Sequence, residues 1–370
     1  MSNNPVRVLY VNGGTMDMGG ISSYMMNYFR NIDKTKVSID FLVHGGVGFY
    51  DEEITRHGGC VFHVPTKKEN ILWNYIKIRE IIKNGNYDIV HCHMDTMNGY
   101  VLRIAKDLKV GIRISHSHNT AHLTRNKIKI IIHEIAMKRI PKYATHAFAC
   151  SEAAGKWLYG SRMPFIIIPN AIDIEKFKFN QKTRTLCRKQ LGLDDKYVIG
   201  HIGRFDYQKN QNFLINVFSE LRKSKKNAVL VLIGDGDLRD EIKKQIDELK
   251  LQDSVLLLGC RRDVSSLINI FDVFAFPSVF EGLGIVAIEA QANGLNVIAS
   301  DAVPQEAIIC PGSIRLPLLQ SEWVNELSNA KTERHQNDEM LEEAGYNIKR
   351  ESKKLEKLYH SLVVETMMNT

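Results

Sequence analysis

Short apolar runs alternate with amphipathic stretches along most of the chain. The run VRVLYVN (6–12) is apolar at almost every position, which is typical of a strand buried on both faces of a parallel sheet. The segment GGISSYMMNYFRNI (19–32) follows it and has helical character. We expect further strands in this half of the chain at VSIDFLVHG (37–45), CVFHVP (60–65), YDIVHCH (87–93), GIRISHSH (111–118) and HAFACS (146–151).

The same alternation starts again after a junction near residues 169–177. Two successive series of strands and helices predict an α/β protein with two doubly wound, Rossmann-like domains. The expected domains are 1–173 and 174–351, and a C-terminal helix over about 352–370 is expected to pack back on the first domain. Strands of the second series are expected at YVIGHIGR (197–204), AVLVLIGDG (228–236), SVLLLG (254–259), VFAFPS (273–278) and LNVIAS (295–300), and the tail from about 339 is expected to be helical.

Length and composition are those of a globular protein with more than one core. The chain has 370 residues, 44% hydrophobic and 25% charged. Its N-terminal segment lacks the pattern of a signal peptide, and no apolar run approaches the roughly 20 residues that cross a bilayer. The six cysteines show neither a CxxC pair nor zinc spacing, so we expect reduced, buried thiols and a cytoplasmic location.

Charge is unevenly distributed along the chain. Residues 1–170 hold 22 Lys and Arg against 13 Asp and Glu, whereas the remainder holds 27 against 29. Six of the basic residues lie with one acid in RNKIKIIIHEIAMKRIPKY (125–143), which is apolar elsewhere. Such a helix can lie on an anionic membrane as a peripheral contact, or it can be a solvated helix over the core. No recognition motif for nucleic acid accompanies the basic charge, so we expect no nucleic-acid partner.

The stretch FEGLGIVAIEA (280–290) places two glutamates on either side of a glycine-rich turn. A strand is expected before it and a helix after it, so Gly282 and Gly284 would lie at a helix N-terminus, where backbone N–H groups can meet a diphosphate. Glu281 would repel a phosphate there, and therefore suits the neutral hydroxyls of a sugar. Glu289, inside the helix, suits ribose hydroxyls. The alternative is a capping carboxylate and a surface glutamate.

A second element, GRFDYQKN (203–210), follows the first expected strand of the second domain. Arg204 and Lys209 are two cations on a strand-to-helix loop, where they could neutralise a pyrophosphate without a metal ion. The alternative is a pair of solvated cations.

Taken together, these motifs resemble the donor half of the family 4 retaining glycosyltransferases, which have the GT-B fold. The resemblance rests on their order and spacing, and the bacterial enzymes of capsular and extracellular polysaccharide synthesis look most similar. It implies two domains facing a central cleft, the first binding the acceptor and the second binding the nucleotide-sugar donor. The segments that carry it are GRFDYQKN, GDGDLRDEI, LLGCRRDV, FPSVFEGLGIVAIEA and NVIASD, with GGTMDMGGISSY, SHSHN, ACSEAA and IPNAIDIEKF in the first half.

The resemblance also implies roles for single residues. Arg204 and Lys209 would hold the donor diphosphate, Glu281 would contact the donor sugar, and Glu289 would bind the ribose. His118 matches the family's first-domain histidine better than His116 does; both would face one side of a strand. The other implied donor contacts are Gly19, Gly20, Gly203, Arg261, Gly282, Leu283 and Gly284.

Three other patterns suggest metal or dinucleotide binding, but each is weaker evidence than the motifs above. The Asp-x-Asp in GDGD (234–237) could bind manganese, but its place between a strand and a helix favours helix capping. His91 and His93 could form a metal pair or simply end a strand. GGTMDMGG (13–20) does not fit the dinucleotide fingerprint, although Asp40 lies about where a ribose-binding acid would.

The sequence therefore predicts a retaining glycosyltransferase that needs no cofactor and no metal ion. Its expected donor is a nucleotide diphosphate sugar, namely a UDP-sugar, and its expected acceptor is a hydroxyl of a glycan or of a lipid-diphosphate-linked oligosaccharide. A UDP-sugar 2-epimerase of the same fold and a non-catalytic nucleotide-sugar-binding protein are the alternatives, and a dehydrogenase is disfavoured. The expected location is cytoplasmic, with peripheral contact at the inner face of the membrane.

Overall fold

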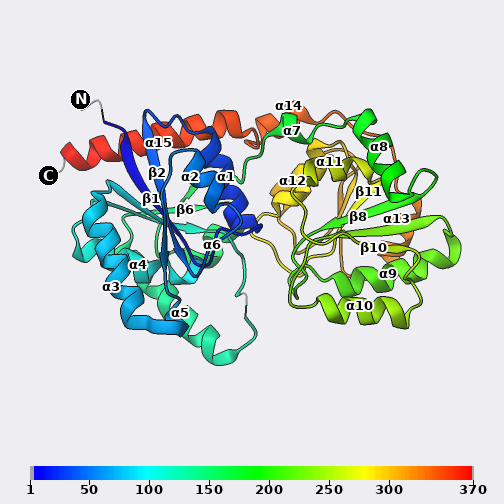
Figure 1. Ribbon diagram of the computed structural model, residues 1–370, viewed down its shortest axis with the longest axis horizontal. Coiled ribbons are helices and arrows are strands. Elements are labelled where there is room, and N and C mark those ends of the chain that lie inside the picture. The colour runs from blue at the N-terminus through cyan, green and yellow to red at the C-terminus, as the bar shows by residue number, and fades with distance from the viewer. Residues whose placement is uncertain (1–3, 123, 369–370) are drawn as a thin grey trace. The chain divides into compact units, whose positions relative to one another are not determined.

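The computed structural model describes residues 4–122 and 124–368 and divides them into two compact units. The first unit contains the chain up to Ala171 together with the C-terminal segment from Ile348, and the second contains Ile172–Asn347. Each unit is built around one sheet of parallel strands covered by helices (Figure 1). The structure therefore shows the predicted α/β class with two Rossmann-like domains.

The first unit has a seven-stranded sheet in the order β3-β2-β1-β4-β5-β6-β7. Alternate residues of β1 (Val6–Asn12) enter two different cores, because successive side chains of a strand point to opposite faces. The other strands are β2 (Val37–His44), β3 (Val61–Val64), β4 (Ile89–His93), β5 (Ile112–Ser117), β6 (His146–Ala149) and β7 (Ile166–Ile167). The helices are α1 (Gly20–Asn31), α2 (Asp51–Arg56), α3 (Lys67–Gly85), η1 (Asp95–Met97), α4 (Asn98–Asp107), α5 (Lys127–Tyr143), α6 (Glu152–Tyr159) and α15 (Ile348–Met368).

The second unit has a six-stranded sheet in the order β10-β9-β8-β11-β12-β13. One face of this sheet packs against α9, α10 and α13. The strands are β8 (Tyr197–Ile202), β9 (Ala228–Ile233), β10 (Val255–Leu257), β11 (Val273–Phe276), β12 (Val297–Ser300) and β13 (Ile314–Leu316). The helices are α7 (Ile174–Phe177), α8 (Gln181–Leu191), α9 (Gln211–Ser224), α10 (Arg239–Glu248), α11 (Val264–Leu267), η2 (Ile268–Ile270), α12 (Ile285–Ala292), η3 (Gln305–Ala307), α13 (Gln320–Asn329) and α14 (Asp338–Glu343).

Helix α15 completes the core of the first unit, where it packs against α1, β1 and β5 (Figure 1). Tyr359 is fully buried there, and its hydroxyl lies 2.7 Å from Nδ1 of His91 and 3.2 Å from the hydroxyl of Tyr10. The last helix of the chain thus closes a core that the N-terminal strands begin.

Some local expectations were wrong. The helical tail is not continuous, because Gly345 adopts a left-handed conformation (φ +85°) between α14 and α15. The short strands β7 and β13 have too few residues to show a period and were not predicted. All six cysteines are free as expected, but Cys60 and Cys260 are exposed.

Replacing Tyr359 by alanine should destabilise the first unit by about 3–5 kcal/mol, because it leaves a cavity in the core and removes two buried hydrogen-bonding contacts. Urea denaturation followed by circular dichroism would measure the change. Lys353→Ala, an exposed position of the same helix, is the matched control and should change stability by less than about 0.5 kcal/mol. A stability equal to wild type for Tyr359→Ala would show that α15 does not contribute to this core.

Candidate active site

The candidate residues of the second unit lie where its strand order reverses. β8 is flanked by β9 on one side and by β11 on the other, so the connections leaving these strands diverge at this point. In open α/β sheets, ligands bind outside the carboxyl ends of the strands at such a switch point. The loop after β8 carries Arg204 and Lys209, and the loop after β11 carries Glu281. Because β8 and β11 pair in parallel, the two loops leave the same edge of the sheet.

Lys209 and Glu281 form a buried ion pair. The Nζ atom of Lys209 lies 2.5 Å from Oε1 of Glu281, and the two side chains are only 16% and 7% exposed. Gln208 donates a 3.3 Å hydrogen bond from its amide to the other carboxylate oxygen. The ammonium group also lies 4.9 Å from the ring centre of Phe276. The two predicted contacts to the donor, one cationic and one anionic, are therefore joined in the structure.

Arg204 has a different environment from Lys209. Its side chain is exposed, and within the described residues its guanidinium has no carboxylate partner. Its backbone is fixed, because its carbonyl accepts a 2.8 Å hydrogen bond from the side chain of Gln211. Gly203 precedes it, and a Cβ there would lie 3.0 Å from Cγ of Lys209. The loop thus presents one free cation beside a paired one.

The loop after β9 also shapes this site, which the sequence analysis did not anticipate. A Cβ at Gly234 would lie 2.0 Å from the carbonyl oxygen of Gly203, and one at Gly236 would lie 2.4 Å from that of Phe205. Backbone hydrogen bonds join the same two loops, with Phe205 donating to the carbonyl of Asp235 at 2.9 Å. The glycines of GDGD allow this close approach and hold the backbone around Arg204.

The expectation that GDGD caps the following helix was wrong. The residue at the cap position of α10 is Leu238, and it makes no side-chain capping bond. Asp235 instead accepts a hydrogen bond from the N–H of Gly236 at 2.8 Å and pairs with Arg239 at 2.6 Å.

The glycine-rich turn after β11 ends at the N-terminus of α12. Gly284 is the capping residue and is left-handed, with φ +91°, and a Cβ there would lie 2.7 Å from a ring carbon of Phe276. The first turn of α12 carries no acidic residue. Its N–H groups and the positive end of the helix dipole are therefore available to an anion. Gly282 and Leu283 are buried in this turn.

Glu289 lies one turn into α12 and is partly buried. Burial raises the pKa of its carboxyl group to about 8, although the nearby Lys176 cation opposes this rise. Within the described residues its carboxyl group has no hydrogen-bond partner. A carboxyl group in this state can exchange hydrogen bonds with ligand hydroxyls.

Arg261 lies on the loop after β10, the edge strand of the sheet. Its guanidinium forms a bidentate ion pair with Asp263, at 2.8 and 2.7 Å. The structure does not bring Arg261 into contact with Arg204 or Lys209, so a ligand reaching it would have to extend along the sheet edge.

In the first unit, Gly19 and Gly20 begin α1. Gly19 is the capping residue, in an extended conformation and without a side-chain cap. A Cβ at Gly20 would have no atom within 4 Å. The start of this helix is therefore sterically open at Gly20, and its cap residue makes no side-chain capping bond.

His118 belongs to a buried array of four histidines at the ends of β4 and β5. The rings of His116 and His118 stack with centres 4.2 Å apart, so both lie on one side of the sheet, as predicted. His91 and His116 are joined by a 3.0 Å contact between ring nitrogens, and His93 and His118 by one of 2.9 Å. Burial lowers the pKa of His118 to about 3 and those of the other three well below the usual value. The array is therefore neutral.

Asp95 holds His118 in place, and sequence reasoning missed it. It follows β4, is left-handed (φ +47°), and is buried. One carboxylate oxygen accepts a 2.6 Å hydrogen bond from the N–H of His118, and the other accepts one of 2.6 Å from the side chain of Asn119. Burial raises its pKa, and these bonds oppose the rise. The only sequence signal was an aspartate shortly after an expected strand. That signal does not show that the loop after β5, with His118 and Asn119, lies next to Asp95.

The chain is similar to known glycosyltransferases over nearly its whole length. Family sequence models match residues 18–176 (Glycosyltransferase Family 4) and 183–351 (Glycosyl transferases group 1). The putative glycosyltransferase EpsF of Bacillus subtilis is 35% identical over 363 residues, which are 94% of each chain. The chain belongs to the family 4 glycosyltransferases.

Two further comparisons concern a relative and a solved structure. The UDP-Gal:alpha-D-GlcNAc-diphosphoundecaprenol alpha-1,3-galactosyltransferase of Escherichia coli is 29% identical over 255 residues, 65% of this chain and 66% of that protein. The crystal structure of Anabaena Alr3699/HepE in complex with UDP and glucose matches with a TM-score of 0.82 at 17% identity, over 96% of this chain and 100% of that one. This likeness establishes the fold, which is GT-B as predicted.

Metal ligands are available to this glycosyltransferase only in the histidine array, as far as the described residues show. His91, His93 and His116 can each offer an atom, and these atoms lie within 4.8 Å of one another. However, His91 and His116 use one ring nitrogen each to contact the other. Both ring nitrogens of His91 contact other side chains, whereas Nε2 of His93 and Nε2 of His116 are buried without a hydrogen-bond partner among the described residues.

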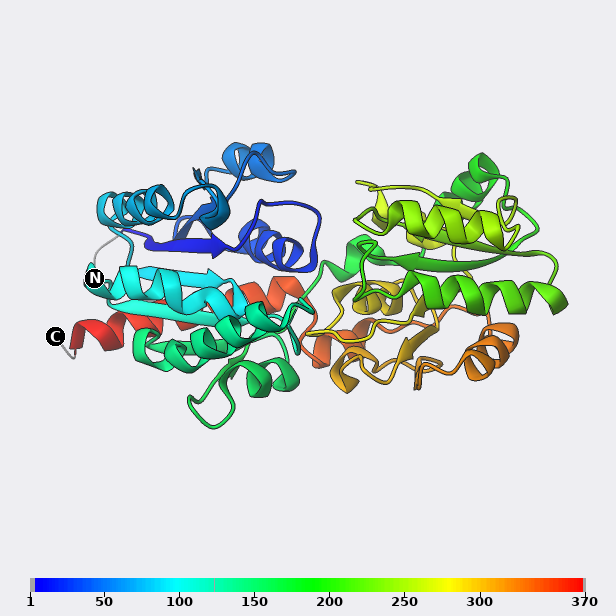
Figure 2. The same ribbon diagram turned by 90° about the horizontal axis from the view of Figure 1, so that it is seen from below.

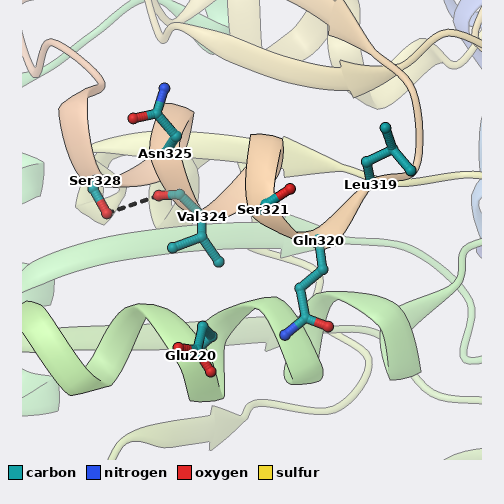
Figure 3. A pocket seen from close by; sticks show the side chains of 7 residues that line it. All are labelled: Glu220, Leu319, Gln320, Ser321, Val324, Asn325 and Ser328. Atoms are coloured by element: carbon teal, nitrogen blue, oxygen red, sulfur yellow. Dashed lines mark hydrogen bonds between the residues drawn. The ribbon is translucent and has the colours of Figure 1, made fainter.

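A separate groove of about 760 Å³ lies between α9 and α13 (Figure 3). It is away from the loops after β8 and β11 and has no cation in its lining, so it does not suit a diphosphate. Its lining consists of Glu220, Leu319, Gln320, Ser321, Val324, Asn325 and Ser328.

Glu289→Gln should change how the stability of this glycosyltransferase depends on pH. Because the folded-state pKa is raised from 4.5 to about 8, the folded unit keeps a proton that the unfolded chain has lost between these values. The resulting stability is complete below about pH 4.5 and is lost as pH rises through about 8. The carboxyl group keeps an exposed edge, so wild type should lose about 1–3 kcal/mol more than the variant between pH 5 and pH 9.

Urea denaturation at a series of pH values measures this difference. Glu248→Gln, on the exposed side of α10, is the matched control and should follow wild type. Parallel pH profiles for wild type and Glu289→Gln would contradict the raised pKa.

Proposed function

We propose that this glycosyltransferase moves a sugar from a nucleotide diphosphate sugar, linked to UDP, to a hydroxyl of a glycan or lipid-linked oligosaccharide in polysaccharide biosynthesis. The transfer retains the anomeric configuration and uses no metal ion. The observation that carries the proposal is the arrangement at the carboxyl ends of β8 and β11, where Arg204, Lys209, Glu281 and the N-terminus of α12 meet.

The positive groups of this arrangement suit the leaving diphosphate. When the bond between the sugar carbon and the phosphate oxygen breaks, negative charge develops on the diphosphate. Arg204, Lys209 and the N–H groups of α12 offset that charge, as a metal ion does in other enzymes. Among the described residues Arg204 has no carboxylate partner to displace, whereas Lys209 must share its charge between Glu281 and the phosphate.

Glu281 positions the sugar and does not form a covalent intermediate. Its carboxylate is held by Lys209 and Gln208, so it accepts hydrogen bonds from sugar hydroxyls in a fixed direction. The acceptor hydroxyl attacks the sugar carbon on the face from which the diphosphate leaves. The proton of that hydroxyl passes to the departing phosphate oxygen, so the new bond has the configuration of the old one.

Other residues complete the binding of the two substrates. Glu289 accepts hydrogen bonds from the ribose hydroxyls, and we assign the loop that carries Arg261 to the base. In the first unit, we assign Gly19 and Gly20 to the donor phosphates and the acceptor, and His118 to orienting the donor sugar or the acceptor. A neutral His118, fixed by Asp95, can donate or accept a hydrogen bond there.

The relatives support a lipid-linked acceptor. The name of the Escherichia coli relative describes transfer from UDP-Gal to a sugar on diphosphoundecaprenol, a lipid carrier. An acceptor of that class would bring this enzyme to a membrane surface, through the basic first unit. No helix in the described ranges is long and apolar enough to cross a membrane.

Nucleotide binding should require no metal ion. In EDTA, UDP or a UDP-sugar should raise the melting temperature of wild type by several degrees, because a ligand that binds only the folded state stabilises it. Lys209→Ala should abolish this shift, whereas Lys226→Ala, at an exposed position of the same unit, should not. A shift that needs added metal, or one seen only with nicotinamide nucleotides, would overturn the proposal.

Replacing Glu289 and replacing Glu281 should affect different steps, UDP binding in one case and turnover in the other. Glu289→Ala should weaken UDP binding about 10-fold or more, because it removes the ribose contact. Glu281→Ala should leave UDP binding largely intact and lower kcat about 100-fold, because it removes contacts to the transferred sugar. Calorimetry and initial rates with a defined acceptor measure the two effects. Equal, negligible effects would refute the assignment, and an epimerised sugar formed without acceptor would indicate an epimerase.

A further inference from the structure

Helix α5 directs an apolar stripe away from its own core. Ile128, Ile131, Ile132 and Ile135 have spacings that place them on one face of a helix, and they are 70%, 60%, 54% and 49% exposed. Amphipathic helices of globular proteins normally turn such a face inward. The buried residues of α5 lie further along, at Met137 and Ile140. The second half of α5 therefore packs on the core, whereas its first half exposes the apolar stripe.

The start of α3 is a second segment with exposed apolar side chains. Asn70 interrupts the helix with a non-helical conformation, and its side chain accepts a 2.9 Å hydrogen bond from the N–H of Trp73. The helix begins again there with Ile71, Leu72 and Trp73, which are 63%, 65% and 53% exposed. Three large apolar side chains at a new helix start cannot all face one core, and here all three face outward.

The apolar segments of α3 and α5 belong to one layer of helices. α4 contacts α3 on one side and α5 on the other, and the three helices lie next to one another in Figure 2 (blue, cyan and green). The Lys67 cation, at the start of α3, also helps to lower the pKa of His133 on α5, after burial and other neighbours. We call the seven exposed side chains the apolar platform: Ile71, Leu72, Trp73, Ile128, Ile131, Ile132 and Ile135.

Positive charge predominates along α5. The only acid in α5 is Glu134, which is paired with His122 at 2.8 Å. Lys127 and Lys129 are exposed beside the isoleucine stripe, and Lys138, Arg139 and Lys142 are exposed in the second half of the helix. Exposed acids next to the other parts of this layer include Glu69, which precedes the exposed apolar residues of α3, and Asp107 on α4.

We propose that the apolar platform inserts into the interface of an anionic lipid bilayer, with α5 lying parallel to the membrane plane. Apolar side chains with tryptophan and with neighbouring Lys and Arg are the combination that partitions to this region, where each cation near the surface adds about 1 kcal/mol. The inference deepens the proposed function, because a lipid-linked acceptor is presented at such a surface.

Charge favours a membrane over a second copy of the chain. A symmetric dimer through the apolar platform would place the same cations against one another, since a two-fold interface uses one patch on both subunits. Anionic headgroups instead neutralise the cations while the acyl region takes up the isoleucines and Trp73.

Vesicle binding with Trp73 as an internal probe tests the proposal. Vesicles of phosphatidylcholine with about 30% phosphatidylglycerol should sediment the full-length protein and shift Trp73 fluorescence to the blue, whereas phosphatidylcholine alone should do neither. High salt should weaken binding. The double variant Ile131→Ser, Ile132→Ser should reduce partitioning about 10-fold or more, by loss of apolar insertion. Trp73→Phe should remove the spectral shift.

The controls separate this proposal from the proposed function. Leu186→Ser, at an exposed apolar position of the second unit, should bind vesicles like wild type. UDP binding should be unchanged in the double variant. Failure of the wild-type protein to bind UDP would therefore refute the donor site without affecting the membrane proposal. Equal sedimentation of wild type and double variant would overturn the membrane proposal. So would dimerisation in analytical ultracentrifugation that the double variant abolishes.

Discussion

The buried ion pair between Lys209 and Glu281 is the contact on which the candidate site depends. It joins the loop after β8 to the loop after β11, the two connections that diverge at the switch point of the sheet. Taking two charges out of water is costly, and the cost is recovered only when the partners are close and further hydrogen bonds support them. Gln208 and the ring of Phe276 provide that support. The pair therefore fixes the relative position of a cation suited to phosphate and a carboxylate suited to hydroxyls.

The neighbouring groups differ in how far their charge is already balanced. Arg204 is an exposed cation without a carboxylate partner in the described part of the chain, and Arg261 is paired with Asp263. Burial raises the pKa of Glu289 to about 8. Arg204 and the N-terminus of α12 therefore offer positive charge, whereas Glu289, inside the helix, offers a carboxyl group whose pKa is raised by burial. A nucleotide sugar carries charge on its diphosphate and hydroxyls on either side of it, and this is the basis of the proposed donor site.

The first unit is organised by neutral contacts instead. Its histidine array is uncharged because all four rings are buried, and the array is framed by Tyr359 from the last helix and by Asp95 after β4. The outer helix layer of this unit is charged, and on α5 exposed cations lie beside exposed isoleucines. Core and surface of this unit thus differ in character, with neutral rings inside and cations beside exposed isoleucines outside.

The sequence alone determined the α/β class, the two domains and the place of the donor motifs, because continuous apolar runs and glycine turns are local signals. It also predicts that Arg204 and Lys209 suit anions and that Glu281 and Glu289 suit hydroxyls, which stays a prediction. Only the tertiary structure decided that Lys209 and Glu281 are partners, that the glycines of GDGD pack on the Arg204 loop instead of capping α10, and that Asp95 holds His118. It also turned the α5 isoleucines outward. These features join residues far apart in the chain, or depend on which face of a helix meets the core, and no local pattern contains that information.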